Sequence, residues 1–214
     1  QFAKRGWEKL MESVASFAVT KPYVVLIPTV LIIIVSSFGA TNIKFSFNMI
    51  KWFPKEVKVD VYNTILEEKF KSTSSLELVV DTGKANGLFE PIVMNAIESA
   101  QEYAKNFKTD AVHIGKTVSI VNSLKLINKT LNNNHLEFYS IPQDKKIIAQ
   151  EMILFENSGW ENLEEIVDNQ FSKARITFGV PTVNAVEYVP FGNQIKKDME
   201  QMFKGIAKVS LTGN

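Results

Sequence analysis

The sequence predicts a mixed α/β fold, on the border between the α+β and α/β classes, preceded by a single transmembrane helix. Three observations support this. Residues 22–43 are apolar and uncharged. After them, short segments rich in β-branched residues alternate with segments of helical periodicity. Two strand–helix–strand stretches flank a group of further helices. We therefore expect an amphipathic helix over residues 1–21, a membrane-spanning helix over 22–43 and a folded domain over 44–214.

Charge and cysteine content narrow the possible functions. The chain has 24 basic and 23 acidic residues, and this near-neutral balance gives no reason to expect a nucleic-acid partner. Cysteine is absent, which is compatible with an oxidising compartment.

Residues 1–21 have the periodicity of an amphipathic helix. The apolar residues recur at helical spacing: Trp7, Leu10, Met11, Val14, Phe17 and Ala18. A helix of this kind that leads directly into a membrane span is expected to lie in the interface, with Trp7 near the headgroups. Lys21 is its last charged residue. The alternative is a helix packed on a soluble partner domain.

Residues 22–43 are long enough to cross a bilayer, since a rise of about 1.5 Å per residue gives roughly 30 Å. A core helix would show a polar stripe, and a signal peptide would have a shorter apolar region before a small-residue cleavage site. Ser36, Ser37, Gly39 and Ala40 resemble such a site. We expect Pro28 to bend the helix. The span contains no Asp, Glu, Lys, Arg or His and is therefore expected to hold no proton carrier.

Flanking charge leaves the orientation of the span open. Each side carries the same number of basic residues: Lys4, Arg5, Lys9 and Lys21 before it, and Lys44, Lys51, Lys55 and Lys58 after it.

The folded domain begins with an extended, aromatic-rich segment over residues 43–54. Strands are expected over residues 74–80, 111–115, 174–180 and 207–213. Helices are expected over residues 59–70, 89–107, 119–131, 143–155, 161–169 and 189–203. This order predicts a split ferredoxin-like (βαβ) arrangement with a helical insert.

Short motifs give little support for an enzyme. Asp81-Thr82-Gly83 resembles the active-site turn of an aspartic protease, but Lys84 follows it and a single copy would require a homodimer. The alternative is an ordinary turn between a strand and a helix. Gly115-Lys116-Thr117 resembles the end of a phosphate-binding loop, yet the first glycine of that pattern is replaced by Asp110.

The remaining polar motifs have simple interpretations. His113 and His135 lack the neighbours of a zinc site, so neither a metal nor a cofactor is expected. The glycosylation-like Asn128-Lys129-Thr130 falls on a predicted helix and is read as coincidence. A solvated helix face explains the acidic cluster of Glu161, Glu164, Glu165 and Asp168. We expect no enzymatic activity.

Several stretches together resemble the RND superfamily of bacterial membrane exporters, in its MMPL-like branch. They occur in order along nearly the whole chain: NIKFSFNMIKWFP, VVDTGKANGLFEP, GKTVSIVNSLKLIN, YSIPQDKKIIAQEMILFENSG and VDNQFSKARITFGVP. The resemblance lies in their order, because no single motif is decisive.

This resemblance implies a proton-driven exporter of lipid-like or hydrophobic substrates. Each half of such a transporter has a leading helix, a periplasmic porter domain and five more helices. The chain is expected to be the first two parts of one half, the second rather than the first, because an amphipathic segment precedes the span. Gln1 and the strand just before Asn214 look like cuts through a longer polypeptide.

The resemblance also implies a location and partners. Residues 44–214 would be periplasmic and the chain would sit in the bacterial inner membrane. Its partners would be membrane lipids, the remaining helices and the second porter domain. The proton-carrying carboxylates of the family lie in helices absent here, so none is assigned. Trp52, Phe53 and Pro54 are expected to form a stiff junction after the span. The alternative is a membrane-tethered binding or assembly module without transport activity.

Overall fold

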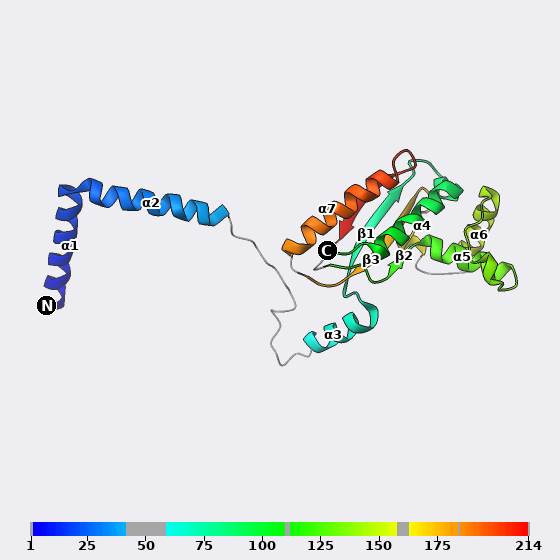
Figure 1. Cartoon of the computed structure of the whole chain (residues 1–214), viewed down its shortest axis with the longest axis horizontal. Helices are drawn as coiled ribbons and strands as arrows, with labels where there is room; N and C mark the ends of the chain where they lie inside the picture. The colour runs from blue at the N-terminus through cyan, green and yellow to red at the C-terminus, as the bar shows by residue number, and fades with distance from the viewer. Residues whose placement is uncertain (1, 42–58, 110–111, 158–162, 184, 214) are drawn as a thin grey trace. The chain divides into compact units, whose positions relative to one another are not determined.

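The computed structural model describes residues 2–41, 59–109, 112–157, 163–183 and 185–213 (Figure 1). The chain forms two compact units, Gln1–Phe45 and Ser46–Asn214, which are described separately.

The first unit contains two helices, α1 (Phe2–Thr20) and α2 (Pro22–Thr41). They are separated by Lys21, whose backbone N–H still bonds to the carbonyl of Phe17 at 3.0 Å. Pro22 has no N–H and disfavours a helical conformation in the residue before it, so the helix is interrupted here and starts again with proline in its first turn.

The second unit is built on a four-stranded sheet with the order β2-β3-β1-β4 in the described part of the chain. Its strands are β1 (Ser74–Asp81), β2 (Thr117–Val118), β3 (Lys173–Val180) and β4 (Lys208–Gly213). Each neighbouring pair is antiparallel. It follows that β1 and β2 run in the same direction, as do β3 and β4, with one strand between the members of each pair.

Two helices cover one face of this sheet, α4 (Pro91–Asn106) and α7 (Ala185–Met202) (Figure 1). Strand residues alternate between the two faces, so the residues of β1 that face the helices are Leu76, Leu78 and Val80, all buried. The register places them opposite Phe178, Ile176 and Ala174 of β3, which are also buried. The core therefore lies between this face of the sheet and the two helices.

The remaining helices include α3 (Val59–Phe70) and the insert between β2 and β3, which consists of α5 (Ile120–Leu131), η3 (Leu136–Phe138) and α6 (Lys145–Asn157). Two further 3₁₀ turns are η2 (Gly87–Phe89) and η4 (Leu163–Glu165). Helix α5 is followed by the polar run of residues 132–134, in which Asn133 and Asn134 both have positive φ. The helical insert predicted from the sequence is confirmed.

Three predicted elements need correction. Ala111 of the strand expected over residues 111–115 lies outside the described residues. The remainder is not a strand: the Gly115 N–H bonds to the Gly179 carbonyl, but the strand ladder with β3 begins two residues later at Thr117. Val112 and Ile114 are buried, and His113 between them forms only an isolated antiparallel bridge with Lys108.

The other two corrections concern helices. The described part of the acidic segment 161–169 forms only the 3₁₀ turn η4, because the Asp168 side chain bonds to the backbone beyond it and turns the chain into β3. Helix α7 begins at Ala185, four residues before the predicted start, which places Pro190 inside the helix rather than in its first turn.

Candidate functional site

Helix α2 is the one helix among the described residues that is long and apolar enough to cross a membrane, by length and composition. Its mean hydropathy over the most apolar window is 2.3, and none of that window is buried. Its large aliphatic side chains are exposed, among them Leu31 and Ile32 at 58% and 63%. Such a continuous apolar surface is unusual for a helix in water, because it would normally be packed against another element.

Pro28 lies within α2, as expected. Its missing N–H leaves the carbonyl of Val24 without its usual helical partner. The adjacent hydroxyl of Thr29 donates to the carbonyl of Val25 at 2.8 Å rather than to that of Val24. The helix nevertheless continues through the proline to Thr41.

Two other predicted interface residues also lie in the first unit. Trp7 is 67% exposed on α1, and Met11, Val14 and Phe17 are exposed at the helical spacing that follows it. The side chain of Lys21, between the two helices, is exposed too. The predicted junction residues Trp52, Phe53 and Pro54 lie outside the described residues.

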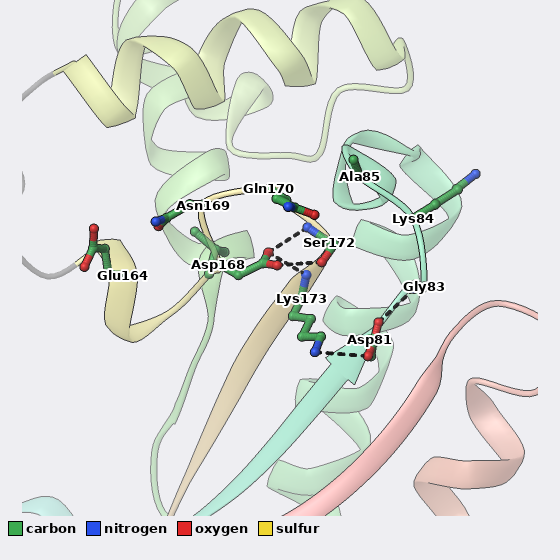
Figure 2. A pocket seen from close by; sticks show the side chains of 11 residues that line it. Asp81, Gly83, Lys84, Ala85, Glu164, Asp168, Asn169, Gln170, Ser172 and Lys173 are labelled. Atoms are coloured by element: carbon green, nitrogen blue, oxygen red, sulfur yellow. Dashed lines mark hydrogen bonds and ion pairs between the residues drawn. The ribbon is translucent and has the colours of Figure 1, made fainter.

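The second unit has a polar pocket where β1 ends and β3 begins, with a volume of about 720 Å³ (Figure 2). It is lined by the turn after β1 and by the segment before β3, including Asp81, Lys84, Glu164, Asp168 and Lys173. This mixture of charges was not predicted, since the two segments are far apart in the sequence.

Asp168 shapes one side of this pocket. Its Oδ1 accepts hydrogen bonds from the backbone N–H groups of Ser172 and Lys173, at 2.7 and 2.8 Å, and its Oδ2 accepts one from the Ser172 hydroxyl. Partial burial opposes ionisation, but these bonds outweigh it and hold the pKa of Asp168 below its usual value.

Asp81 shapes the other side. Its Oδ1 accepts a hydrogen bond from the N–H of Gly83 at 2.8 Å, and its Oδ2 lies 3.5 Å from Lys173 Nζ (Figure 2). Gly83 has φ of +70°, which favours glycine in this turn. The Thr82 hydroxyl donates to the carbonyl of Ser172 at 2.7 Å, so the turn is fastened to the start of β3.

The aromatic pair Phe89–Phe171 supports the same loops, with ring centroids 5.1 Å apart. Phe171 has φ of +49°, a conformation that costs energy in a bulky residue. The N–H of Leu88 bonds to its carbonyl at 3.0 Å. No local sequence pattern predicts this conformation.

Several polar side chains of the pocket are paired with one another. Ser172 donates to Asp168, but no histidine is among the described lining residues to act as the base of a nucleophile. Asp81 pairs with a lysine, whereas an aspartic protease needs two carboxylates that share a proton.

Two other motifs are explained by packing. A Cβ added at Gly115 would lie 2.5 Å from the carbonyl oxygen of Lys71, so glycine is required there for close approach of two backbones. Asn128 is 7% exposed and its amide donates to the carbonyl of Ser140 at 2.9 Å, which leaves it unavailable to a glycan.

Comparison with known proteins supplies no family. No family model matches this chain, and no curated protein matches it either.

Proposed function

We propose that the chain is the leading transmembrane helix and the periplasmic porter domain of one half of a proton-driven exporter, of the RND superfamily and its MMPL-like branch. The observation that carries this proposal is the pairing of α2, apolar and unburied over a membrane-spanning length, with a separately compact mixed α/β unit. The order of the sequence stretches that resemble the family supplies the rest of the support.

The strand order supports a split ferredoxin-like fold for the porter domain. In such a fold two strand–helix–strand units interleave in one antiparallel sheet. Here β1-α4-β2 and β3-α7-β4 interleave in the order β2-β3-β1-β4, and α5, η3 and α6 form an insert between the units.

In this proposal α2 spans the inner membrane with α1 on the cytoplasmic side, and residues 44–214 are periplasmic. Lipid covers the exposed apolar side chains of α2, and each Å² of apolar surface removed from water in this way contributes about 25 cal/mol to the free energy of insertion. The exposed Trp7, Met11, Val14 and Phe17 of α1 contact the interfacial region.

The transported substrate is lipid-like or amphiphilic, and the porter domain moves as a rigid unit to open or close its route. Helix α2 contains no Asp, Glu, Lys, Arg or His. The groups that carry protons therefore belong to other helices of the parent transporter. We expect motion to reach the domain through residues 43–54, where the sequence predicts a stiff junction at Trp52, Phe53 and Pro54.

The test is transport by the parent protein carrying both Trp52→Gly and Pro54→Gly. We expect export to fall several-fold at unchanged expression, because a flexible connection no longer transmits movement. Lys51→Gly and Lys55→Gly together are the matched control, since they also introduce two glycines into the same segment but keep Trp52 and Pro54. Normal export by the first variant, or an equal loss in the control, contradicts the proposed junction.

A second function, a membrane-tethered binding or assembly module without transport, is favoured by the polar pocket at the end of β1. Its open walls offer charged groups of both signs, which suits reversible binding of a polar partner. Purified parent protein reconstituted in vesicles distinguishes the two: substrate movement that needs a proton gradient supports the exporter, and its absence supports the module.

A further inference from the structure

Glu151 is a carboxylic acid placed inside the contact between α6 and the rest of the second unit. It is 3% exposed, and its neighbours on the same helical face, Ile148 and Met152, are completely buried. Its Oε2 atom is buried and has no hydrogen-bond partner. Native proteins rarely leave a buried polar atom unpaired, because its desolvation is not offset.

The charged groups on the elements packed against α6 are already engaged or exposed. On α5 they are Lys125 and Lys129. Lys125 Nζ donates to a carboxylate oxygen of Glu98 and lies 4.7 Å from the ring centroid of Tyr139, and Lys129 is partly exposed. η2 contains no charged residue.

The charged groups near the ends of α6 are likewise engaged or exposed. Asp144, directly before the helix, accepts a hydrogen bond from the Lys146 N–H at 2.7 Å. Lys145 Nζ bonds to Glu90, directly after η2, at 2.7 Å. At the other end, the exposed Glu156 and Glu164 line a small pocket together with Asp168, whose carboxylate is bound to Ser172. Lys146 is exposed. No ion pair with Glu151 occurs among the described residues.

A carboxylate in this position would carry a buried negative charge without a nearby cation, which is much more costly than a buried neutral acid. Burial raises the pKa of Glu151 to about 7. An α6 that had moved into water would release the same proton near the ordinary glutamate value of 4.5. Ionisation of Glu151 and detachment of α6 are therefore thermodynamically linked.

We propose that α6 is held on the second unit by a proton-dependent contact: the neutral acid of Glu151 permits close packing on η2 and α5, and loss of its proton releases the helix. The opening of α6 becomes more favourable as pH rises from about 4.5 to 7, and is constant above that range. This inference is independent of the transport proposal.

Amide hydrogen exchange of the full chain in lipid nanodiscs tests the contact. The readout is the protection factor of the Ile148 and Met152 amides relative to amides of β1, which corrects for base-catalysed exchange. The difference between the two pKa values predicts that the equilibrium constant for opening of α6 increases roughly 30-fold between pH 5.5 and 8.5. In Glu151→Gln the side chain stays neutral, so relative protection should be independent of pH.

Glu156→Gln, on the same helix and exposed, is the matched control and should retain the dependence of the unmodified chain. Constant relative protection in the unmodified chain, or equal pH dependence in Glu151→Gln, overturns the proposal. If Glu151→Gln does not fold, the ¹³C resonance of the Glu151 carboxyl group decides. A midpoint near 7 that coincides with the loss of protection supports the contact, and a midpoint near 4.5 overturns it.

Discussion

Asp168 fixes the shape of a loop through one side chain. Its two oxygens accept three hydrogen bonds from Ser172 and Lys173, and its own N–H donates to the carbonyl of Lys173 at 3.1 Å. These bonds bring the chain from η4 into β3 and set one wall of the polar pocket. The run of acidic residues in the sequence indicates a solvated helix face, and it does not reveal the turn that Asp168 forms.

Removing the charge of Asp168 should therefore destabilise the second unit. We expect Asp168→Asn to lower the free energy of unfolding by about 1.5–3 kcal/mol, the usual value for hydrogen bonds to a charged group. Because the pKa of Asp168 is lowered in the folded state, its contribution is present above the unfolded-state pKa and disappears as pH falls through the folded-state pKa. Urea unfolding between pH 7 and pH 3 measures both effects.

The control for this prediction is Glu165→Gln, an exposed acid in the same segment. It should unfold like the unmodified chain throughout the pH range. Equal pH dependence in Asp168→Asn and the unmodified chain would show that the loop is held by other contacts.

The ends of helices were predicted well where side chains close in the sequence bond to the backbone at that end. The start of α5 is an example. Ser119 caps the helix by accepting a hydrogen bond from the Val121 N–H at 3.2 Å, and the Asn122 side chain accepts one from the Ser119 N–H at 2.9 Å. The Ser119 hydroxyl also donates to Gln101 Oε1 of α4 at 2.8 Å. The expected helix over residues 119–131 includes Ser119, one residue before α5 begins, and no local pattern predicts the hydrogen bond from Ser119 to α4.

Because of this additional hydrogen bond to α4, Ser119 should contribute more to the free energy of unfolding than an ordinary helix cap. We expect Ser119→Ala to lower the free energy of unfolding by about 1–2 kcal/mol, towards the upper end because buried Gln101 loses a partner as well. Ser123→Ala, a change inside the same helix, should have an effect below about 0.5 kcal/mol. Thermal unfolding of the two variants compares them, and equal effects would contradict the proposed role of the cap.

Elements set by long-range contacts were predicted less well. Strand β2 has only two residues, and its position follows from bonds such as Gly115 N–H to the Gly179 carbonyl at 2.8 Å. No local pattern encodes that partner. By contrast, β1, β3 and β4 were predicted closely because each combines β-branched residues with flanking turns.

At the scale of the whole molecule, the division into two units agrees with the abrupt change in composition after the apolar segment. Hydropathy alone identified α2, and helical periodicity alone identified α1. The polar pocket and the burial of Glu151 were not foreseen, since each depends on which helices and loops meet in three dimensions. The predicted transport function rests on resemblance and remains a prediction.

Membrane insertion of α2 gives a direct test at this scale. When the chain is expressed in bacteria, we expect it to remain in membranes after extraction with alkaline carbonate. Leu31→Arg places a charge at the centre of α2, at a cost of about 2.5–3.5 kcal/mol in insertion free energy, and should increase the extracted fraction. Thr41→Arg at the end of the helix should have little effect, because a long cationic side chain reaches the headgroups there.

Release of the unmodified chain by carbonate would contradict insertion. Equal extraction of the two arginine variants would contradict a central position for Leu31 in the bilayer.

The pairing of β1 with β4 has a mechanical consequence. The register places Leu76, near the start of β1, opposite Gly213, at the end of β4. The two strands are antiparallel, so the chain enters and leaves the sheet at the same end. A force pulling those two points apart would open the strand pair like a zipper, one hydrogen bond after another, instead of shearing all of its bonds together. We therefore expect this module to yield at low load when stretched between those points, and to tolerate being spliced into a loop of another protein.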